Sequence, residues 1–251
     1  MNYRKRIALT TVSAMALCAS SIATAQEEAE SYMLSILEIQ VKAGHDSDFR
    51  AGLAAWKECY LANDGEGSWN LWRRQQGVGN VYAAVFRMKS WADVDTPDAA
   101  SQACQDVARD QVIPFTHGEN TVNSYASSMP DISRAGPSGD VLWVSSFRAK
   151  DGRLMMDAVR KISAAIKQVE GDSRGYWYNV AGGHEKAPDY FVSTPFENFA
   201  ALDQERDGVW DVVTKVHGAE ESERLRADFM KSMDAGWSYI YRRVPDLSHS
   251  P

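Results

Sequence analysis

Two His-Gly pairs carry the side chains best suited to acid–base chemistry in this 251-residue sequence, His117-Gly118 and His217-Gly218. Imidazole titrates near neutral pH, so either histidine could serve as a general base, or as an axial ligand of haem in the case of His217. Tyr239 is a third candidate, as a proton relay. The alternative is that each pair ends a helix, with glycine left-handed and histidine beside the negative helix terminus. That alternative also explains why both halves of the chain carry the pair.

Aromatic side chains gather on segments that have the composition of strands. They are Trp69, Trp72, Tyr176, Trp177, Tyr178, Trp237, Tyr239 and Tyr241. Because side chains alternate along a strand, Asn70 and Trp72 share one face, and we expect Trp177 and Asn179 on the matching face of a second strand. Such a face combines flat apolar walls with a few hydrogen-bonding groups, as ligand pockets do. The alternative is core packing between two sheets.

Arg74 falls on the same face as Trp72 and could bind an anionic group through two parallel hydrogen bonds. The second half of the chain has Val180 and Ala181 at the corresponding place, so such a site would exist in one half only. The alternative is a solvated arginine at a strand end. The ligand-binding candidates are therefore Asn70, Trp72, Arg74, Trp177 and Asn179.

No motif in the sequence is specific to one chemistry. The chain lacks GxSxG, HExxH, CxxC, CxxCH and a phosphate-binding glycine loop. The Gly-rich turn at 181–183 joins two strand-like segments and opens no helix, so it predicts a hairpin. We therefore expect no metal site, and the sequence does not define a substrate or a reaction.

The elements that would position these residues recur along the chain. Met33–Glu38 corresponds to Val141–Ser146 at an offset of 108 residues, and each segment is followed by a helix, an aromatic strand, a turn and a third strand. Both helices are amphipathic, with apolar residues at i, i+4, i+7 and i+11. These residues are Phe49, Leu53, Trp56 and Tyr60 in the first, and Met155, Val159, Ile162 and Ile166 in the second. The closing segments Pro130–Ser133 and Pro245–Ser248 match at an offset of 115.

Each copy therefore has the order β-α-β-β-α-β, with its second helix at about 98–116 or 199–217 and a further helical segment at 219–234. This order is the ferredoxin-like arrangement, an antiparallel sheet with both helices on one face. We expect an α+β fold of two such repeats, residues 26–135 and 136–251, joined by a linker rich in Gly, Pro and Ser. The bare sheet face of each repeat would then cover that of the other.

The element order, the duplication and the Trp/Tyr-rich second strand, Trp69–Trp72 and Tyr176–Asn179, resemble the dimeric α/β-barrel superfamily. The chain looks like a member whose usual homodimer is fused into one polypeptide, and the resemblance covers residues 31–133 and 139–248. It implies an intrachain dimeric α/β barrel. The superfamily includes cofactor-free monooxygenases, lactone isomerases, haem proteins such as chlorite dismutases and dye-decolorising peroxidases, and members without known activity. No catalytic residue set carries over by position.

The N-terminal residues 1–25 have the three parts of a signal peptide, with positive Arg4–Arg6, an apolar run and the small residues Ala23–Ala25. The apolar run is shorter than the roughly 20 residues that a membrane span needs. We therefore expect a periplasmic or secreted protein without membrane association after cleavage. In such a compartment Cys59 and Cys104 are expected to form a disulfide, with two free buried thiols as the alternative.

The net charge of −7 is dispersed and lacks the basic footprint that nucleic-acid binding requires. Our first hypothesis is an exported barrel protein that binds a small apolar or aromatic molecule between its two sheets, without a bound cofactor. The second is a cofactor-free enzyme of the monooxygenase or isomerase kind. The third is a haem protein. Because the barrel would close within one chain, we expect a monomer.

Overall fold

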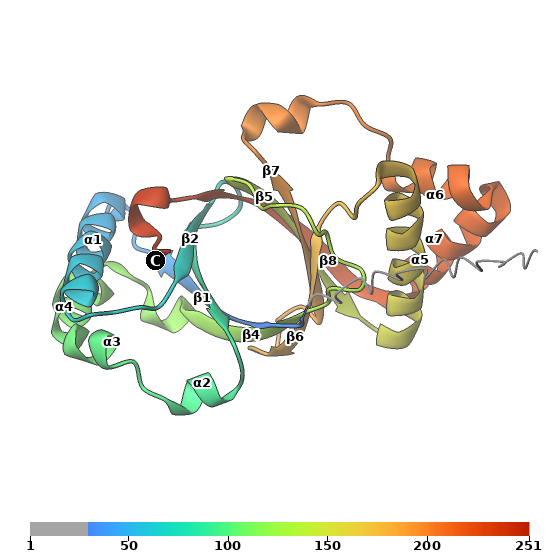
Figure 1. Ribbon diagram of the computed structural model, residues 1–251. Helices are drawn as coiled ribbons and strands as arrows, with labels where there is room; N and C mark the ends of the chain where they lie inside the picture. The colour runs from blue at the N-terminus through green and yellow to red at the C-terminus, as the bar shows by residue number, and fades with distance from the viewer. Residues whose placement is uncertain (1–29, 251) are drawn as a thin grey trace, which may run out of the picture.

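The eight β-strands of the computed structural model close into one barrel, which Figure 1 shows end-on. The structure describes residues 30–250. The strands are β1 (Met33–Val41), β2 (Trp69–Arg74), β3 (Asn80–Met88), β4 (Val122–Ser128), β5 (Val141–Ala149), β6 (Tyr176–Gly182), β7 (Tyr190–Phe196) and β8 (Met233–Arg243). The signal peptide predicted at residues 1–25 lies outside the described residues.

Around the barrel the strands follow the order β1-β3-β2-β8-β5-β7-β6-β4, and every neighbouring pair is antiparallel. The four strands of the first half of the chain are contiguous, as are the four of the second half. Pairing of β2 with β8 and of β4 with β6 joins the halves. The fold is therefore α+β, and the inner faces of all the strands enclose one interior.

Helices lie outside the barrel on two opposite sides (Figure 1). They are α1 (Asp46–Ala62), α2 (Ala92–Asp95), α3 (Ala99–Ala103), α4 (Gln105–Gln111), α5 (Gly152–Glu170), α6 (Val209–His217) and α7 (Ala219–Ser232). None of the helices within residues 30–250 has the length and apolar character needed to cross a membrane.

The prediction of one continuous second helix in each half is wrong. In the first half, α3 ends and α4 begins at Cys104. In the second half a 3-10 segment, Phe199–Asp203, precedes α6. Helix α6 begins after Gly208, whose backbone N–H donates to Asp211 Oδ2 at 3.0 Å. The contact at Gly208 thus starts α6 as a separate helix, where apolar spacing alone suggested continuity.

Helix α5 matches its sequence prediction because its periodicity and both of its end signals agree. Asp151 Oδ1 accepts a hydrogen bond from the Leu154 backbone N–H at 3.0 Å at the N-terminus. Gly171 ends the helix with φ of 83°, a left-handed conformation that favours glycine. The apolar stripe is buried, at Met155, Val159, Ile162 and Ile166.

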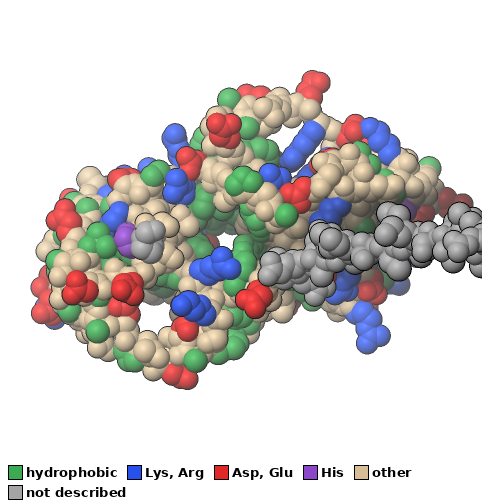
Figure 2. Space-filling model, viewed as in Figure 1, with side chains coloured by type: hydrophobic (Ala, Val, Ile, Leu, Met, Phe, Trp, Pro, Cys, Tyr) green, Lys and Arg blue, Asp and Glu red, His purple; other side chains and the backbone are tan. Residues whose placement is uncertain are grey.

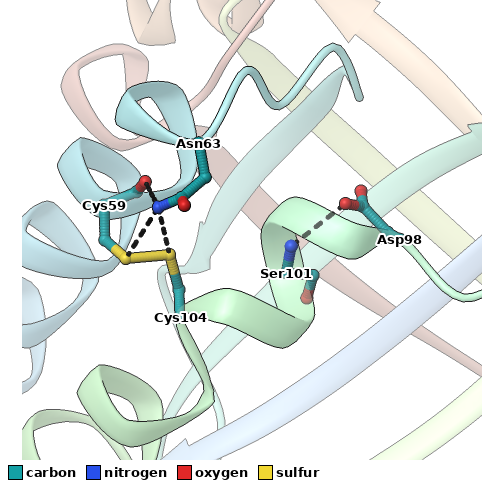
Figure 3. Close-up of a disulfide and its surroundings, with 5 residues drawn as sticks. All are labelled: Cys59, Asn63, Asp98, Ser101 and Cys104. Carbon is teal, nitrogen blue, oxygen red and sulfur yellow. Dashed lines mark hydrogen bonds between the residues drawn. A yellow bond between two sulfur atoms is a disulfide. The ribbon is translucent and has the colours of Figure 1, made fainter.

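A disulfide joins the last turn of α1 to the α3–α4 junction (Figure 3). It links Cys59 and Cys104, the two cysteines that the sequence pairs, with their Cα atoms 5.9 Å apart. Asn63 Nδ2 donates to the Cys59 carbonyl oxygen at 2.9 Å. The Asp98 carboxylate caps α3 by accepting the Ser101 N–H at 3.0 Å. Two short helices are in this way fixed against α1.

The tail that follows β8 crosses to the first half of the chain. The Val244 backbone N–H donates to the Leu71 carbonyl oxygen at 2.8 Å. Ser248 Oγ accepts the Leu71 N–H at 3.0 Å. Val244 and Leu247 are buried in the core beneath α1, together with Phe49. The end of the second half therefore completes the outer core of the first.

The tail that follows β4 makes the reciprocal crossing. The Met129 backbone N–H donates to the Trp177 carbonyl oxygen at 2.9 Å. Ser133 Oγ accepts the Trp177 N–H at 2.8 Å. Ile132 is buried with Met155 in the core beneath α5. The two halves are thus interlocked by their tails as well as by their edge strands.

Candidate functional site

The barrel interior holds a cavity of about 660 Å³, lined by inward-facing side chains from all eight strands. Much of the wall is apolar, and its large side chains include Leu34, Ile36, Trp72, Val85, Val144 and Phe191. Figure 2 shows the molecule hollowed at the barrel, with hydrophobic side chains gathered around the opening. Small-molecule sites usually measure roughly 300–1,000 Å³, so this interior can enclose a molecule of two or three fused rings.

The predicted candidates on β2 line this cavity. Asn70, Trp72 and Arg74 all face the interior, as strand alternation predicts. Leu71 points the other way and packs in the core beneath α1. Trp72 is only 7% exposed and packs with Tyr241. Binding of a ligand by these three residues stays a prediction.

The candidates on β6 do not face the cavity, and the expectation that they share the Trp72 face is wrong. Trp177 lies on the outer face and stacks on Phe147 beneath α5, with ring centroids 5.7 Å apart. Asn179 is exposed. The residues of β6 that line the cavity are Tyr176, Tyr178 and Val180.

A register error of one residue explains this difference. The sequence comparison matches Asn70 with Trp177. In the structure Leu71 is the equivalent of Trp177, because each donates its backbone N–H to the serine of a crossing tail. Trp72 therefore corresponds to Tyr178. A shift of one residue moves every side chain of a strand to its opposite face.

A polar cluster lies inside the cavity where β2 pairs with β8. Tyr241 Oη donates to Glu38 Oε1 at 3.2 Å. The Arg74 guanidinium lies over the Tyr239 ring, with Cζ 4.5 Å from the ring centroid. Arg74 Nη2 donates to the Val78 carbonyl oxygen, whereas its buried Nε has no hydrogen-bond partner among residues 30–250. No carboxylate in that part of the chain forms an ion pair with Arg74.

The electrostatics of this cluster fix the direction of its hydrogen bond. Burial raises the pKa of the Tyr241 hydroxyl, and the neighbouring Glu38 charge raises it further, whereas Arg74 acts in the opposite direction. Tyr241 is therefore neutral near pH 7 and donates to the carboxylate. Within the described residues, Glu38 is the only acidic side chain of the cavity lining, and Tyr241 is its only hydrogen-bond partner.

The other junction between the halves, where β4 pairs with β6, lacks these groups. Strand register shows which residues are equivalent in the two halves. Ser146 takes the place of Glu38, and Val180 that of Arg74. Ser124 takes the place of Tyr239, and Ala126 that of Tyr241. All four are small or apolar, and none carries a charge. The two junctions therefore differ, and the only carboxylate of the described cavity lining lies at the β2–β8 junction.

A second polar group in the lining involves Arg87. Its guanidinium lies over the Tyr32 ring, with Cζ 4.0 Å from the centroid. The Tyr32 and Tyr178 hydroxyl oxygens are 3.1 Å apart and share a hydrogen bond. Burial raises the pKa of Tyr178, and the adjacent Tyr32 hydroxyl adds to that shift. Both tyrosines line the cavity and bring polar hydroxyl groups to its wall.

Glu38 was missed by sequence reasoning although a signal for it exists. It continues the alternation Leu34, Ile36, Glu38 along β1, and all three side chains line the cavity. A charged residue on the apolar face of a predicted strand costs free energy when buried, so it marks a candidate site. Arg87 on β3 gives the same signal, on the face that also carries Val85.

The predicted catalytic histidines lie outside the cavity. His117 Nδ1 is 3.2 Å from Glu119 Oε1, and the residue precedes a 3-10 turn instead of ending a helix. His217 is exposed and ends α6, followed by Gly218 at φ of 81°, as the helix-end alternative predicts. Tyr239, by contrast, lines the cavity. Within residues 30–250, no three His, Cys, Asp or Glu side chains are grouped as metal ligands.

The haem hypothesis named His217 as the axial ligand, and that residue does not line the cavity. His184 is the only described histidine within the lining. His184 lies exposed on the β6–β7 connection, where its Nδ1 accepts the Lys186 backbone N–H at 3.0 Å. No described cysteine or methionine lines the cavity. Tyrosine can also serve as an axial ligand of haem iron, and tyrosines of the barrel strands line the cavity.

No family model and no curated protein matches the sequence. Solved structures match over most of the chain. A proposed monooxygenase from Lactobacillus acidophilus is 9% identical, with a TM-score of 0.50, over 85% of this chain and 94% of its own. A proposed monooxygenase from Fusobacterium nucleatum is 8% identical, with a TM-score of 0.52, over 86% and 93%. A chlorite dismutase variant from Candidatus Nitrospira defluvii is 8% identical, with a TM-score of 0.54, over 87% and 94%.

These neighbours are dimeric α/β-barrel proteins, and the chain shares their fold. The fold expected from the sequence resemblance is confirmed at this level. At such low identity the likeness concerns the fold alone, because one fold hosts many unrelated functions. The function has to be argued from the residues of the cavity.

Proposed function

We propose that this protein binds a small, flat, largely aromatic molecule inside its barrel, with an anionic or acidic oxygen of the ligand next to Arg74. The observation that carries the proposal is the Arg74 guanidinium in the cavity wall, which forms no ion pair within residues 30–250. Its one hydrogen bond within those residues goes to the Val78 carbonyl oxygen, so a ligand oxygen can accept from the remaining N–H groups that face the cavity. The surrounding apolar wall favours binding of aromatic rings, because burial of apolar surface contributes roughly 25 cal/mol per Å².

The lining suggests how such a ligand would lie. The acidic oxygen would lie at the β2–β8 junction, next to Arg74. The rings would then extend past Trp72 toward Val144 and Phe191, which line the remaining wall. Asn70 supplies an amide that can orient a second polar substituent.

A matched pair of probes tests this function. Tryptophan fluorescence would follow titration of the purified protein with 2-naphthoate and with the neutral 2-naphthamide. We expect 2-naphthoate to bind more tightly, and Arg74→Met to weaken it about 10- to 100-fold, because a charge-assisted hydrogen bond contributes about 1.5–3 kcal/mol. The amide should be affected little.

Arg242 provides the control for this substitution. It is an exposed arginine on β8, with its guanidinium 5.7 Å from the Phe199 ring centroid and away from the cavity lining. Arg242→Met should leave the affinity for 2-naphthoate unchanged. Equal binding by the wild type and Arg74→Met would reject the proposed site.

A second candidate function is a cofactor-free enzyme. It is favoured by one observation, the Glu38 carboxylate in an otherwise acid-free lining. A carboxylate in an apolar cavity is a typical general base. The residues that sequence analysis favoured for this role, His117 and His217, lie elsewhere, which leaves Tyr239 as the one predicted candidate in the cavity.

We also propose that the two halves arose by duplication and do the work of two subunits. Support comes from the crossing tails. Val244 donates its backbone N–H to the Leu71 carbonyl oxygen, and Met129 donates to that of Trp177 in the same way. The donors are 115 residues apart in the sequence, and the acceptors, each of which also donates its N–H to a tail serine, are 106 apart. Repeated units keep equivalent contacts, and insertions between them change the offset from one segment to the next. A barrel closed within one chain needs no partner, so light scattering should give a monomer mass.

Export remains a proposal that rests on residues 1–25 and is supported by the Cys59–Cys104 disulfide, a feature of oxidising compartments. Mass spectrometry of the protein from its natural host should find a mature N-terminus at Gln26. An intact Met1 in a cytosolic fraction would contradict it.

A further inference from the structure

Glu38 occupies a position in the barrel that does not need an acid. Its equivalent in the second half is Ser146, which also faces the cavity, and the strands around both positions pair in the same way. The barrel therefore closes without a carboxylate at this place. Moving a carboxylate from water into an apolar interior is unfavourable unless it is compensated. The structural role of Glu38 alone does not account for its charge.

The hydrogen bonding of Glu38 leaves most of its capacity free. An ionised carboxylate can accept about four hydrogen bonds. Within residues 30–250, Glu38 accepts one side-chain hydrogen bond, to Oε1 from Tyr241 Oη at 3.2 Å. The side chain belongs to the cavity wall, so the remaining lone pairs are available to a bound molecule. Tyr241 is itself only 7% exposed, and its hydrogen bond holds the Glu38 carboxylate in place.

Arg74 lies in the same cluster, because it is the partner of Tyr241 across β2 and β8 and its guanidinium lies over the Tyr239 ring. A general base and a cation facing one cavity match the demands of enolisation. In that reaction a proton leaves carbon while negative charge builds on a nearby oxygen, and the charge is stabilised by a fixed cation. The junction between β4 and β6 has no carboxylate in the described cavity lining, so only the β2–β8 junction combines a base with a cation.

We infer that Glu38 is a general base that removes a proton from a bound aryl ketone with an acidic α C–H bond, while Arg74 holds the oxygen that becomes negative. This inference rests on the proposed function, since it uses the same cavity and the same arginine. It goes further by naming the substrate class and the proton acceptor. Tyr241 acts as a positioning residue, because it reaches the reacting atoms only through Glu38.

The step needs no oxidant, metal or second substrate. Glu38 takes the α proton, and the electron pair of the C–H bond forms the C=C bond of an enolate. The carbonyl π electrons move to oxygen, where Arg74 stabilises the negative charge. Return of the proton from Glu38 to the same carbon regenerates the ketone, and its return to a conjugated carbon would isomerise it. Atoms and charges balance in both directions.

Hydrogen exchange of a bicyclic ketone tests this step directly. The purified protein would be incubated with 2-tetralone in deuterated buffer, and NMR would follow replacement of the C1 protons by deuterium. Wild-type protein should accelerate exchange above the buffer rate in proportion to protein concentration. Glu38→Gln should lower that acceleration by about 100-fold or more, since general-base catalysis contributes roughly 10²–10⁴. Glutamine keeps an oxygen that can accept the Tyr241 hydrogen bond.

Two further variants separate chemistry from structure. Glu58→Gln removes an exposed carboxylate on α1 and should leave the exchange rate unchanged. Tyr241→Phe should lower the maximal exchange rate and leave the 2-tetralone concentration for half-maximal rate unchanged, because the hydrogen bond that holds the Glu38 carboxylate in place is lost. A purely structural role for Tyr241 would weaken 2-tetralone binding as well.

The outcomes distinguish this inference from the proposed function. If 2-tetralone quenches tryptophan fluorescence but exchanges no faster than in buffer, or if Glu38→Gln keeps wild-type exchange, the cavity binds ligands and Glu38 is not a base. If neither 2-tetralone nor 2-naphthoate binds, the proposed function fails and the inference fails with it. Exchange that is lost only in Glu38→Gln and Arg74→Met supports both.

Discussion

Tyr241 and Glu38 are 203 residues apart in the chain, and their side chains meet inside the barrel through a 3.2 Å hydrogen bond. Their strands, β8 and β1, are not neighbours, because β2 and β3 lie between them. The bond therefore spans the cavity surface instead of following the sheet ladder. It links the two halves of the chain at the one junction that also carries Arg74 and Tyr239. This pair fixes where acid–base chemistry could occur in the protein.

The first prediction concerns stability at alkaline pH. The folded-state pKa of Tyr241 is raised above the unfolded value by burial and by Glu38. Its contribution to stability is therefore complete below the unfolded pKa of about 10 and is lost as pH rises from there toward the folded pKa. Urea unfolding between about pH 8 and pH 11 should show a steeper alkaline loss for wild type than for Tyr241→Phe. Parallel curves for the two proteins would contradict the assignment.

The second prediction compares two tryptophans on opposite faces of the barrel wall. Trp72 lines the cavity, whereas Trp177 packs beneath α5. Both replacements by alanine should lower the free energy of unfolding by about 3–5 kcal/mol, as for other large buried side chains. Only Trp72→Ala should weaken 2-naphthoate binding, by tenfold or more. Calorimetric titration of both variants checks this, and equal losses of affinity would place the ligand elsewhere.

The third prediction concerns the disulfide. Cys59 and Cys104 enclose a sequence separation of 45 residues, for which removal of the bridge should cost about 2–4 kcal/mol of unfolding free energy. The double variant Cys59→Ser/Cys104→Ser should therefore unfold at lower denaturant concentration than the oxidised wild type. A reductant should lower the stability of wild type and leave the double variant unchanged. Sensitivity of the double variant to reductant would point to a different bridge.

The fourth prediction concerns the independence of the two halves. A fragment of residues 30–135 would leave the β2 and β4 edges unpaired and would lack Val244 and Leu247 from the core beneath α1. We expect it to self-associate or remain unfolded, because open apolar edges pair with other chains. Co-expression with residues 136–250 should restore a soluble complex. A well-folded fragment monomer with buried tryptophans would show that the halves do not depend on each other.

Strand β2 shows which part of the candidate site could be predicted from the sequence. The alternation of Asn70, Trp72 and Arg74 is a local property, and the structure places all three in the cavity wall. The match between this strand and β6 is not local, because it depends on how each strand pairs with its neighbours. An error of one residue in that match therefore predicted Trp177 on the cavity face, where the structure has Tyr178. The prediction of His117 and His217 as catalytic residues was wrong for a related reason. The position of a loop residue in the chain does not determine whether it lies inside or outside the barrel.

The sequence by itself determined the elements of this protein and their α+β order. Apolar spacing and end signals defined helices such as α5, alternation defined strand faces, and compartment reasoning paired Cys59 with Cys104. Only the tertiary structure decided which strand edges join, and therefore that Glu38 and Tyr241 share one cavity with Arg74. The physical reason is that helix and strand periodicity arise from neighbouring residues. Barrel closure and register arise from hydrogen bonds between strands far apart in the chain, whose partners no local pattern specifies.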